Sequence, residues 1–249
     1  MDGLTLEGRT ALVTGGAGGI GSAICRQLAA LGARVVIVDL NIAGARAIAG
    51  DLNQGVAFSV DLAEPASVDA LVDEVKRKVG RVDVLVNNAG WDKVEPFTQS
   101  VPATWDRLLN INLRAPVQLT HAFLGDMLAQ QWGRLVYISS DAARVGSTGE
   151  SVYSACKADL IGFSKTMARE AARSQVTSNV VCPGPSDTPL LADVARDHPK
   201  LIEALKRSIP LGRLGQPDDV AGLVGFLTSE RAGYITGQTI SVSGGLTMI

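Results

Sequence analysis

Short runs of Val, Ile and Leu alternate with longer amphipathic segments along the whole chain, which limits the folds it can adopt. The runs are nearly continuous in apolar residues, a pattern typical of strands buried on both faces of a parallel sheet. Such strands, alternating with helices, predict right-handed crossover connections and a doubly wound sheet. We expect strands at Thr10–Thr14, Arg34–Asp39, Val56–Val60, Val82–Asn87, Leu135–Ser139, Val176–Cys182 and Thr239–Val242.

The segments between these runs predict helices, and several carry start signals such as Pro65 and Pro217 at the first turn. No linker or shift in composition divides the 249 residues. We therefore expect one α/β domain over 1–249, a seven-stranded parallel sheet with helices on both faces. The expected helices cover about 19–31, 42–52, 65–79, 103–131, 151–173 and 217–228.

One proline-rich stretch interrupts this alternation, with five prolines between Pro183 and Gly215 and a weaker helical pattern over Leu190–Arg207. It leaves directly from a strand end, where open α/β sheets bind their ligands. We expect residues of about 185–215 to form a substrate lid, and the alternative is a surface excursion without a role.

A glycine cluster follows the first strand, in the order Thr14-Gly15-Gly16-Ala17-Gly18-Gly19-Ile20-Gly21, and a helical segment comes next. Such a turn lets the backbone approach a pyrophosphate at a helix N-terminus. Asp39 ends the second strand, twenty-four residues after Gly15, where an acid is expected to bind the adenine ribose of a dinucleotide. Its carboxylate would repel a 2′-phosphate, and the glycine turn holds no Arg or Lys, so NAD is predicted over NADP.

Tyr153 and Lys157 lie four residues apart in a predicted helix and therefore share one face of it. A tyrosine phenol has a pKa of about 10, and a fixed cation beside it favours the phenolate. Ser140 lies thirteen residues upstream of the tyrosine. Taken alone, the Tyr–Lys pair is more typical of a solvated helix face than of a catalytic device, so the surrounding motifs have to decide between the two interpretations.

These motifs occur together in an order that resembles the short-chain dehydrogenase/reductase family over essentially the whole chain. The glycine spacing is T-G-x-x-x-G-x-G, and Asn87-Asn88-Ala89-Gly90 follows the fourth strand. Asn112, Ser140, Tyr153 and Lys157 then come in sequence, before Pro183-Gly184 and Thr188 after the sixth strand. The resemblance implies a Rossmann-type fold and hydride transfer between a nicotinamide cofactor and a secondary alcohol or ketone.

The resemblance also implies a role for each matching residue. Tyr153 would exchange the substrate proton, Lys157 would lower the pKa of Tyr153 and bind the nicotinamide ribose, and Ser140 would stabilise the oxyanion. Asn112 would hold a water that relays the proton. The expected NAD-binding residues are Gly15, Gly19, Ile20, Gly21, Asp39, Asp61, Leu62, Asn88, Ala89, Gly90, Tyr153, Lys157, Pro183, Gly184, Ser186 and Thr188.

Three segments, 87–92, 140–147 and 182–188, show a narrower likeness to β-hydroxyacyl-CoA oxidoreductases of anaerobic aromatic-acid degradation. On this basis Trp91 and Arg144 are expected to shape the acyl pocket. Arg144 could instead form a surface ion pair with Asp141 or Glu150. The alternatives are a 3-oxoacyl-thioester (CoA or acyl-carrier-protein) reductase, a polyol or sugar dehydrogenase, or, in a different class, a catalytically silent NAD(H)-binding sensor or scaffold.

The composition favours a cytoplasmic enzyme with a small-molecule substrate. A formal charge of −2 provides no attraction for nucleic acid or anionic lipid, and no apolar run approaches the ~20 residues of a membrane span. Cys25, Cys156 and Cys182 show no disulfide or zinc spacing. His121 and His198 likewise show no metal-ligand spacing, so we expect no metal. The family resemblance and the apolar C-terminus suggest a homo-oligomer, with a tetramer expected.

Overall fold

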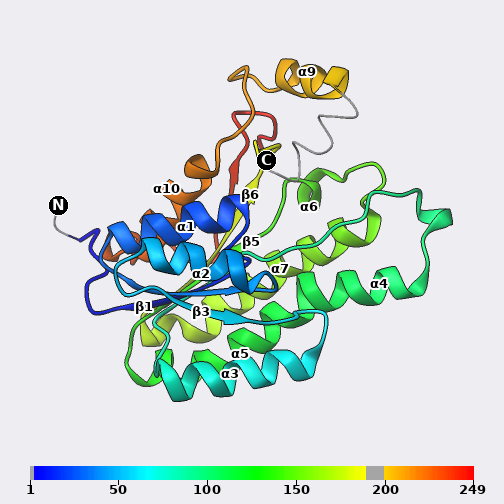
Figure 1. Ribbon diagram of the computed structural model, residues 1–249. Helices are drawn as coiled ribbons and strands as arrows, with labels where there is room; N and C mark the ends of the chain where they lie inside the picture. The colour runs from blue at the N-terminus through cyan, green and yellow to red at the C-terminus, as the bar shows by residue number, and fades with distance from the viewer. Residues whose placement is uncertain (1–2, 189–198) are drawn as a thin grey trace.

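The computed structural model describes residues 3–188 and 199–249, and its centre is one sheet of seven parallel strands (Figure 1). The strand order is β3-β2-β1-β4-β5-β6-β7, which confirms the predicted doubly wound α/β fold. Observed strand ends differ from the predicted ones by at most two residues. The strands are β1 Thr10–Thr14, β2 Arg34–Asp39, β3 Val56–Ser59, β4 Val84–Asn87, β5 Gly133–Ile138, β6 Val176–Pro183 and β7 Thr239–Val242.

Helices cover both faces of the sheet, so side chains that alternate along a strand enter two separate cores. In β1, Ala11 and Val13 belong to the core beneath α1 and α10, while Leu12 belongs to the core beneath α3, α5 and α7. The described helices are α1 Gly19–Ala30, α2 Ile42–Asp51, α3 Pro65–Lys78, α4 Pro102–Leu109, α5 Ala115–Ala129, α6 Ala142–Val145, α7 Ser151–Ala171, α9 Pro199–Ser208 and α10 Pro217–Thr228.

The predicted helix over 103–131 is interrupted, which corrects the sequence-based expectation. A π-helical turn at Asn110–Arg114 separates α4 from α5, and the amide of Ala115 reaches back to the carbonyl of Asn110. Pro116 has no N–H to donate to the carbonyl of Asn112, so regular α-helical bonding cannot continue here. Asn112 therefore lies in a π-bulge, a feature frequent at functional sites.

The strand order reverses at β1, which pairs with β2 on one side and with β4 on the other. The chain therefore leaves two adjacent strands, β1 and β4, in opposite directions, and opens a crevice at their carboxyl ends. The glycine turn follows β1 and Asn88 follows β4. Two of the predicted cofactor segments thus share the position where open α/β sheets bind ligands.

The expected lid is anchored at both of its ends. The amide of Asp187 donates to the carbonyl of Gly215 at 2.7 Å, and the amide of Gly215 donates to the carbonyl of Pro185 at 3.0 Å. Between them, α9 stands beyond the carboxyl end of β6, at the top of Figure 1. Residues 189–198 of the predicted lid lie outside the described residues. Among the helices that the structure describes, none has the length and apolar character that crossing a bilayer requires.

Candidate active site

The glycine turn packs so closely against its neighbours that side chains are excluded from it. Gly15 has a φ of +65°, in the left-handed region that favours glycine. A Cβ on Gly15 would lie 2.9 Å from the Cα of Ala89, and one on Gly21 would overlap the carbonyl oxygen of Gly15. The turn is therefore a bare backbone surface at the N-terminus of α1.

This surface fits the pyrophosphate of a dinucleotide. Helix α1 begins at Gly19 without a side-chain cap, and Ile20 lies in its first turn. The first N–H groups of a helix have no partner within it, and they attract phosphate oxygens together with the helix dipole. Because Gly15 and Gly21 carry no Cβ, the backbone can fold this tightly at the start of α1.

Two side chains from neighbouring strand ends fix the turn in place. The carboxylate of Asp39 accepts from the amides of Ala17, at 3.0 Å, and Asn41, at 2.9 Å. The Nδ2 of Asn88 donates to the carbonyls of Thr14, at 2.9 Å, and Gly15, at 3.2 Å. The acid predicted to select the cofactor therefore lies beside the glycine turn, with its negative charge held in position.

The other predicted cofactor residues lie at the same edge of the sheet in varied settings. Asp61 uses one carboxylate oxygen within its own turn, accepting from the amide of Ala63 at 2.9 Å, and Leu62 packs against the second core. Pro183 ends β6. A Cβ on Gly184 would lie 2.8 Å from the Cβ of Ser243. The remaining two are Ser186, which bridges to Gly215, and Thr188, which borders the part of the chain left undescribed.

Asn112 is fully buried and binds only backbone groups through its side chain. Its Nδ2 donates to the carbonyls of Trp91, at 2.7 Å, and Leu108, at 3.0 Å, while its Oδ1 accepts from the amide of Trp91 at 3.2 Å. A Cβ on Gly90 would lie 3.2 Å from both the Oδ1 of Asn112 and the Nζ of Lys157. These two predicted catalytic residues therefore meet across Gly90, which leaves space between them.

Lys157 is a cation in an almost closed environment, with 2% of its surface exposed. Its Nζ donates to the carbonyl of Ile138, at the end of β5, at 2.9 Å. Burial lowers the pKa of Lys157 to about 8, and the nearby Cys156, Cys182 and Asp92 offset only part of that effect. The site thus holds an ammonium group whose charge costs stability.

Tyr153 lies one helical turn before Lys157 on α7, and Ser140 is close enough to its hydroxyl to influence the pKa of the phenol. The Nζ of Lys157 is 5.6 Å from the centroid of the tyrosine ring. Burial raises the pKa of Tyr153 most, the negative charges of Asp92 and Glu150 raise it further, and Ser140 lowers it. The pKa of Tyr153 is therefore raised in the ligand-free protein, chiefly by burial, and the expected influence of Lys157 on it stays a prediction.

The two predicted substrate residues flank this catalytic group. The ring of Trp91 lies under the guanidinium of Arg107, 4.6 Å away, while its backbone binds Asn112. Arg144 lies in α6 with 12% of its side chain exposed and a distant partner, the Oδ1 of Asp141 at 4.0 Å. Arg144 therefore forms the ion pair with Asp141 that the alternative interpretation gave, at a long distance and in a mostly buried setting rather than on the surface.

The resemblance to known proteins extends over the full length of the chain. The family model described as Enoyl-(Acyl carrier protein) reductase matches residues 15–247. The 3-oxoacyl-[acyl-carrier-protein] reductase FabG of Escherichia coli is 37% identical over 247 residues, which cover 99% of this chain and 100% of the relative. The chain belongs to the short-chain dehydrogenase/reductase family.

Other proteins similar to this short-chain dehydrogenase/reductase are described as acting on different substrates. The 2,3-dihydroxy-2,3-dihydro-p-cumate dehydrogenase of Pseudomonas putida is 37% identical over 251 residues, covering 99% of this chain and 97% of the relative. A Beutenbergia cavernae structure with low-occupancy NADP, described as an NAD(P)-dependent gluconate 5-dehydrogenase, has a TM-score of 0.91 at 34% identity and covers 98% of each chain. A protein from Agrobacterium tumefaciens described as a gluconate dehydrogenase reaches a TM-score of 0.94 at 27% identity, with 99% of each chain covered.

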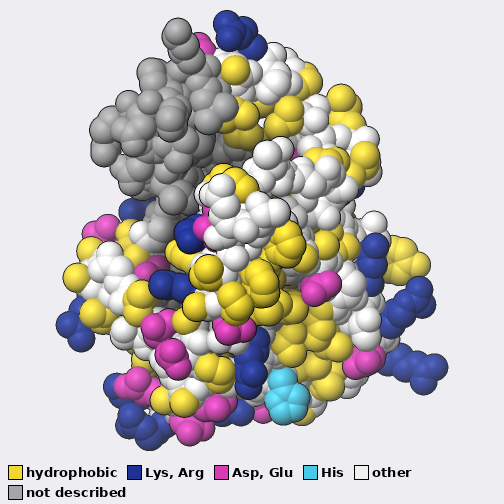
Figure 2. Space-filling model, turned by 90° about the vertical axis from the view of Figure 1, so that its right-hand side faces the viewer, with side chains coloured by type: hydrophobic (Ala, Val, Ile, Leu, Met, Phe, Trp, Pro, Cys, Tyr) yellow, Lys and Arg dark blue, Asp and Glu magenta, His cyan; other side chains and the backbone are white. Residues whose placement is uncertain are grey.

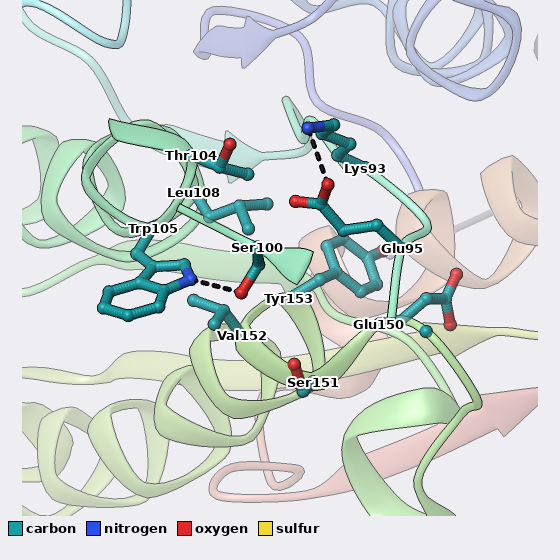
Figure 3. A pocket seen from close by; sticks show the side chains of 11 residues that line it. Lys93, Glu95, Ser100, Thr104, Trp105, Leu108, Glu150, Ser151, Val152 and Tyr153 are labelled. Carbon is teal, nitrogen blue, oxygen red and sulfur yellow. Dashed lines mark hydrogen bonds and ion pairs between the residues drawn. The ribbon is translucent and has the colours of Figure 1, made fainter. Parts of the chain in front are cut away.

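A small cavity lies behind Tyr153 in this short-chain dehydrogenase, between α4, α7 and the loop after β4 (Figure 3). Glu95 and Glu150 line it from two different loops, and the carboxylate of Glu95 points to Lys93, with which it forms an ion pair at 2.7 Å. The sequence-based predictions had assigned no role to Asp92 or Glu95. Asp92 comes soon after the Asn87-Asn88-Ala89-Gly90 motif at the end of β4. Its place at the same edge of the sheet as Tyr153 is the sequence feature that could have identified it as a site residue.

Proposed function

We propose that this oxidoreductase interconverts a secondary alcohol and a ketone with NAD, and that its substrate is a β-hydroxyacyl-CoA, including cyclic ones. The observation that supports this proposal most is the convergence of four side chains at one point. Asn112 and Lys157 meet across Gly90, and Tyr153 lies beside Lys157, with Ser140 close enough to its hydroxyl to lower the pKa of the phenol. The glycine turn touches the same segment through Ala89.

In this proposal the nicotinamide, when bound, accepts or donates the hydride, and the side chains handle the proton and the oxygen. In oxidation Tyr153 takes the proton of the substrate hydroxyl, and in reduction it returns that proton to the forming alkoxide. Ser140 donates a hydrogen bond to the oxygen on which charge develops. Lys157 supplies a positive charge and binds the nicotinamide ribose, and Asn112 places a water that connects Lys157 to solvent.

The choice of NAD rests on Asp39. Its carboxylate is fixed by two backbone amides next to the glycine turn, so it cannot easily turn away from a 2′-phosphate. The relative from Beutenbergia cavernae holds NADP, which makes a direct comparison of the two cofactors necessary. A kcat/KM for NADP equal to or above that for NAD would contradict this assignment.

The choice of an acyl-CoA rests on the likeness of segments 87–92, 140–147 and 182–188 to 2-hydroxycyclohexanecarboxyl-CoA dehydrogenase, and on Arg144. The side chain of Arg144 is mostly buried, its one ion pair is long, and a guanidinium offers several fixed donors, which suits a thioester or amide oxygen. The second candidate is a 3-oxoacyl-[acyl-carrier-protein] reductase, favoured by the names of several relatives over their full length. We further propose that residues of about 185–215 cover the bound substrate.

The exposed apolar surface supports a homo-oligomer, for which we propose a tetramer in the cytoplasm. Figure 2 shows hydrophobic side chains gathered near the centre of one face of the molecule. Large apolar side chains exposed on α4, α5 and the C-terminus include Leu109, Val117 and Met248. Surfaces of this kind are typical of subunit contacts. Sedimentation of the purified protein would test the proposed assembly.

The substrate proposal is tested by a screen for NAD reduction. β-Hydroxyacyl-CoA thioesters, cyclic and linear, are compared with their free acids, with matched acyl-carrier-protein thioesters and with polyols. We expect the highest kcat/KM for a CoA thioester. Activity on free acids or polyols alone would refute the thioester assignment, and no turnover of any alcohol or ketone despite tight NADH binding would favour a cofactor-binding sensor.

A further inference from the structure

Ser140 lies in a tight turn between β5 and α6, and this turn determines how its hydroxyl is oriented. The Oγ of Ser140 accepts from the amide of Ala142 at 3.1 Å. The carbonyl of Ser140 accepts from the amide of Ala143 at 3.1 Å. Because the Oγ is held as an acceptor by the backbone, the hydroxyl can still donate its one proton elsewhere. The turn therefore presents Ser140 as a hydrogen-bond donor.

Asp141, the next residue, joins this turn to two strands of the sheet. Its amide donates to the carbonyl of Pro183 on β6 at 3.3 Å. Its carbonyl accepts from the first amides of α6, those of Arg144, at 2.9 Å, and Val145, at 3.1 Å. Its carboxylate oxygen Oδ2 accepts from the hydroxyl of Ser241 on β7 at 2.7 Å. Asp141 is therefore bound to α6, β6 and β7 at once.

The bond to Ser241 is the hydrogen bond that holds the side chain of Asp141, a residue with 5% of its surface exposed. The other carboxylate oxygen, Oδ1, is buried and has no hydrogen-bond partner among the described residues, and the Nη1 of Arg144 lies 4.0 Å from it. At 2.7 Å the bond to Ser241 has the short length of a charge-assisted hydrogen bond. Loss of the Ser241 hydroxyl would therefore release the carboxylate from β7 and leave it unsatisfied.

Ser241 is itself held from the C-terminal side. Its hydroxyl is hydrogen-bonded to that of Ser243 at 3.0 Å, and the Oγ of Ser243 accepts from the amide of Thr247 at 3.2 Å. Ser243 is buried, and a Cβ on Gly184 would lie 2.8 Å from the Cβ of Ser243, so the two strand ends are closely packed. A continuous chain of hydrogen bonds thus leads from Thr247 to the carboxylate next to Ser140.

We propose that Asp141 and Ser241 are positioning residues for the reaction, and that their hydrogen bond fixes the turn that directs the Ser140 hydroxyl at the substrate oxygen. Both act through Ser140 and touch no reacting atom. A donor stabilises developing charge only where it is held in place beforehand, and small displacements lower the rate steeply. This inference rests on the proposed dehydrogenase function, in which Ser140 stabilises the charge on that oxygen.

The test compares kcat and the KM for NAD in wild type and three variants of Ser241, with the best alcohol substrate from the screen. In S241A the hydroxyl is lost, so kcat should fall about tenfold, a part of the ~10²–10³ that loss of a whole oxyanion donor costs, with an unchanged KM for NAD. S241T keeps a hydroxyl and should retain the wild-type kcat. The thiol of S241C is a weaker donor, so its kcat should lie between those of S241A and wild type.

Ser174 provides the matched control. It lies before the amino end of β6, and its Oγ accepts from the Nε2 of Gln131 at 3.2 Å. S174A therefore also loses one side-chain hydrogen bond, but at the end of the sheet away from the site, and should keep the wild-type kcat.

A double substitution distinguishes the positioning of Ser140 from general support of the fold. In S140A the donor is gone, so adding S241A should lower kcat no further, because residues that act as a unit are not additive. The same fold loss in the S140A background as in wild type would overturn the proposal. So would a wild-type kcat in S241A, or a loss in S241T as large as that in S241A.

A second measurement needs no turnover and separates this inference from the dehydrogenase proposal. In crystals of wild type, S241A and S241T grown without cofactor, the distance from the Ser140 Oγ to the Ala142 amide is compared. It should stay near 3.1 Å in wild type and S241T, and the bond should be lost in S241A. An unchanged turn in S241A would refute the positioning role, whereas a turn that changes as expected in a protein without turnover would refute only the dehydrogenase function.

Discussion

Replacement of Lys157 should show by how much the buried ammonium group lowers the free energy of unfolding. The pKa of Lys157 falls from its ordinary value of 10.5 to about 8 because the ammonium is desolvated. At about 1.4 kcal/mol for each pKa unit, this fall corresponds to a cost of about 3 kcal/mol below pH 8. Lys157→Met fills similar space without a charge and removes that cost.

The pH dependence of this cost has a definite sign. Between about pH 8 and 10.5 the unfolded chain holds a proton that folded Lys157 has lost, so raising the pH disfavours unfolding. The free energy of unfolding of the wild type should therefore rise, relative to that of K157M, by about 3 kcal/mol across this window.

Urea unfolding of both proteins at intervals from pH 7 to 10.5, without cofactor, measures this difference. Lys165→Met is the matched control, because Lys165 lies on the same helix and is exposed. Its stability should run parallel to that of the wild type at every pH. A constant difference between wild type and K157M over the whole range would refute the buried-cation argument.

Three further predictions concern the cofactor and substrate sites. Gly21→Ala places a Cβ on the carbonyl oxygen of Gly15, so it should weaken NADH binding at least tenfold in a fluorescence titration and lower the free energy of unfolding by about 1–3 kcal/mol. The control Gly125→Ala, in open space on α5, should instead raise the free energy of unfolding by up to about 1 kcal/mol. Normal NADH affinity in G21A would contradict the tight-turn interpretation. Asp39→Ser should raise kcat/KM for NADP relative to NAD by at least about tenfold, since it removes a charge that repels the 2′-phosphate. Arg144→Ala should raise KM for the acyl-CoA with little change in KM for NAD, and an unchanged acyl-CoA KM would leave Arg144 a structural role only.

The sequence was sufficient to predict the fold because its periodicity is strong and its strands are buried. The short β-branched run Val35–Val38, set between helical segments, favours an interior strand, and the observed bounds of β2 are the predicted ones. The helix predicted over 103–131 failed at one point only. Pro116 lies inside an otherwise helical pattern and marks the interruption, but the π-bulge that buries Asn112 depends on packing that periodicity does not encode.

The residues of the candidate site were predictable, whereas their electrostatics were not. Four-residue spacing places Tyr153 and Lys157 on one face of α7, and that much can be read from the chain. The pKa of Tyr153 is shifted upward by burial and by the negative charge of Asp92, which lies on a loop distant in sequence. Spacing along one helix cannot reveal a charge that tertiary packing brings from another segment.

The role of Tyr153 is tested most directly by Tyr153→Phe, which removes the hydroxyl and keeps the ring. With the best alcohol substrate from the screen, kcat for NAD reduction should fall at least a thousandfold, within the ~10²–10⁴ range for loss of a general acid–base group. NADH affinity, measured by fluorescence, should change by less than about threefold, because the glycine turn and Asp39 remain. A kcat within tenfold of wild type would show that Tyr153 does not carry the proton.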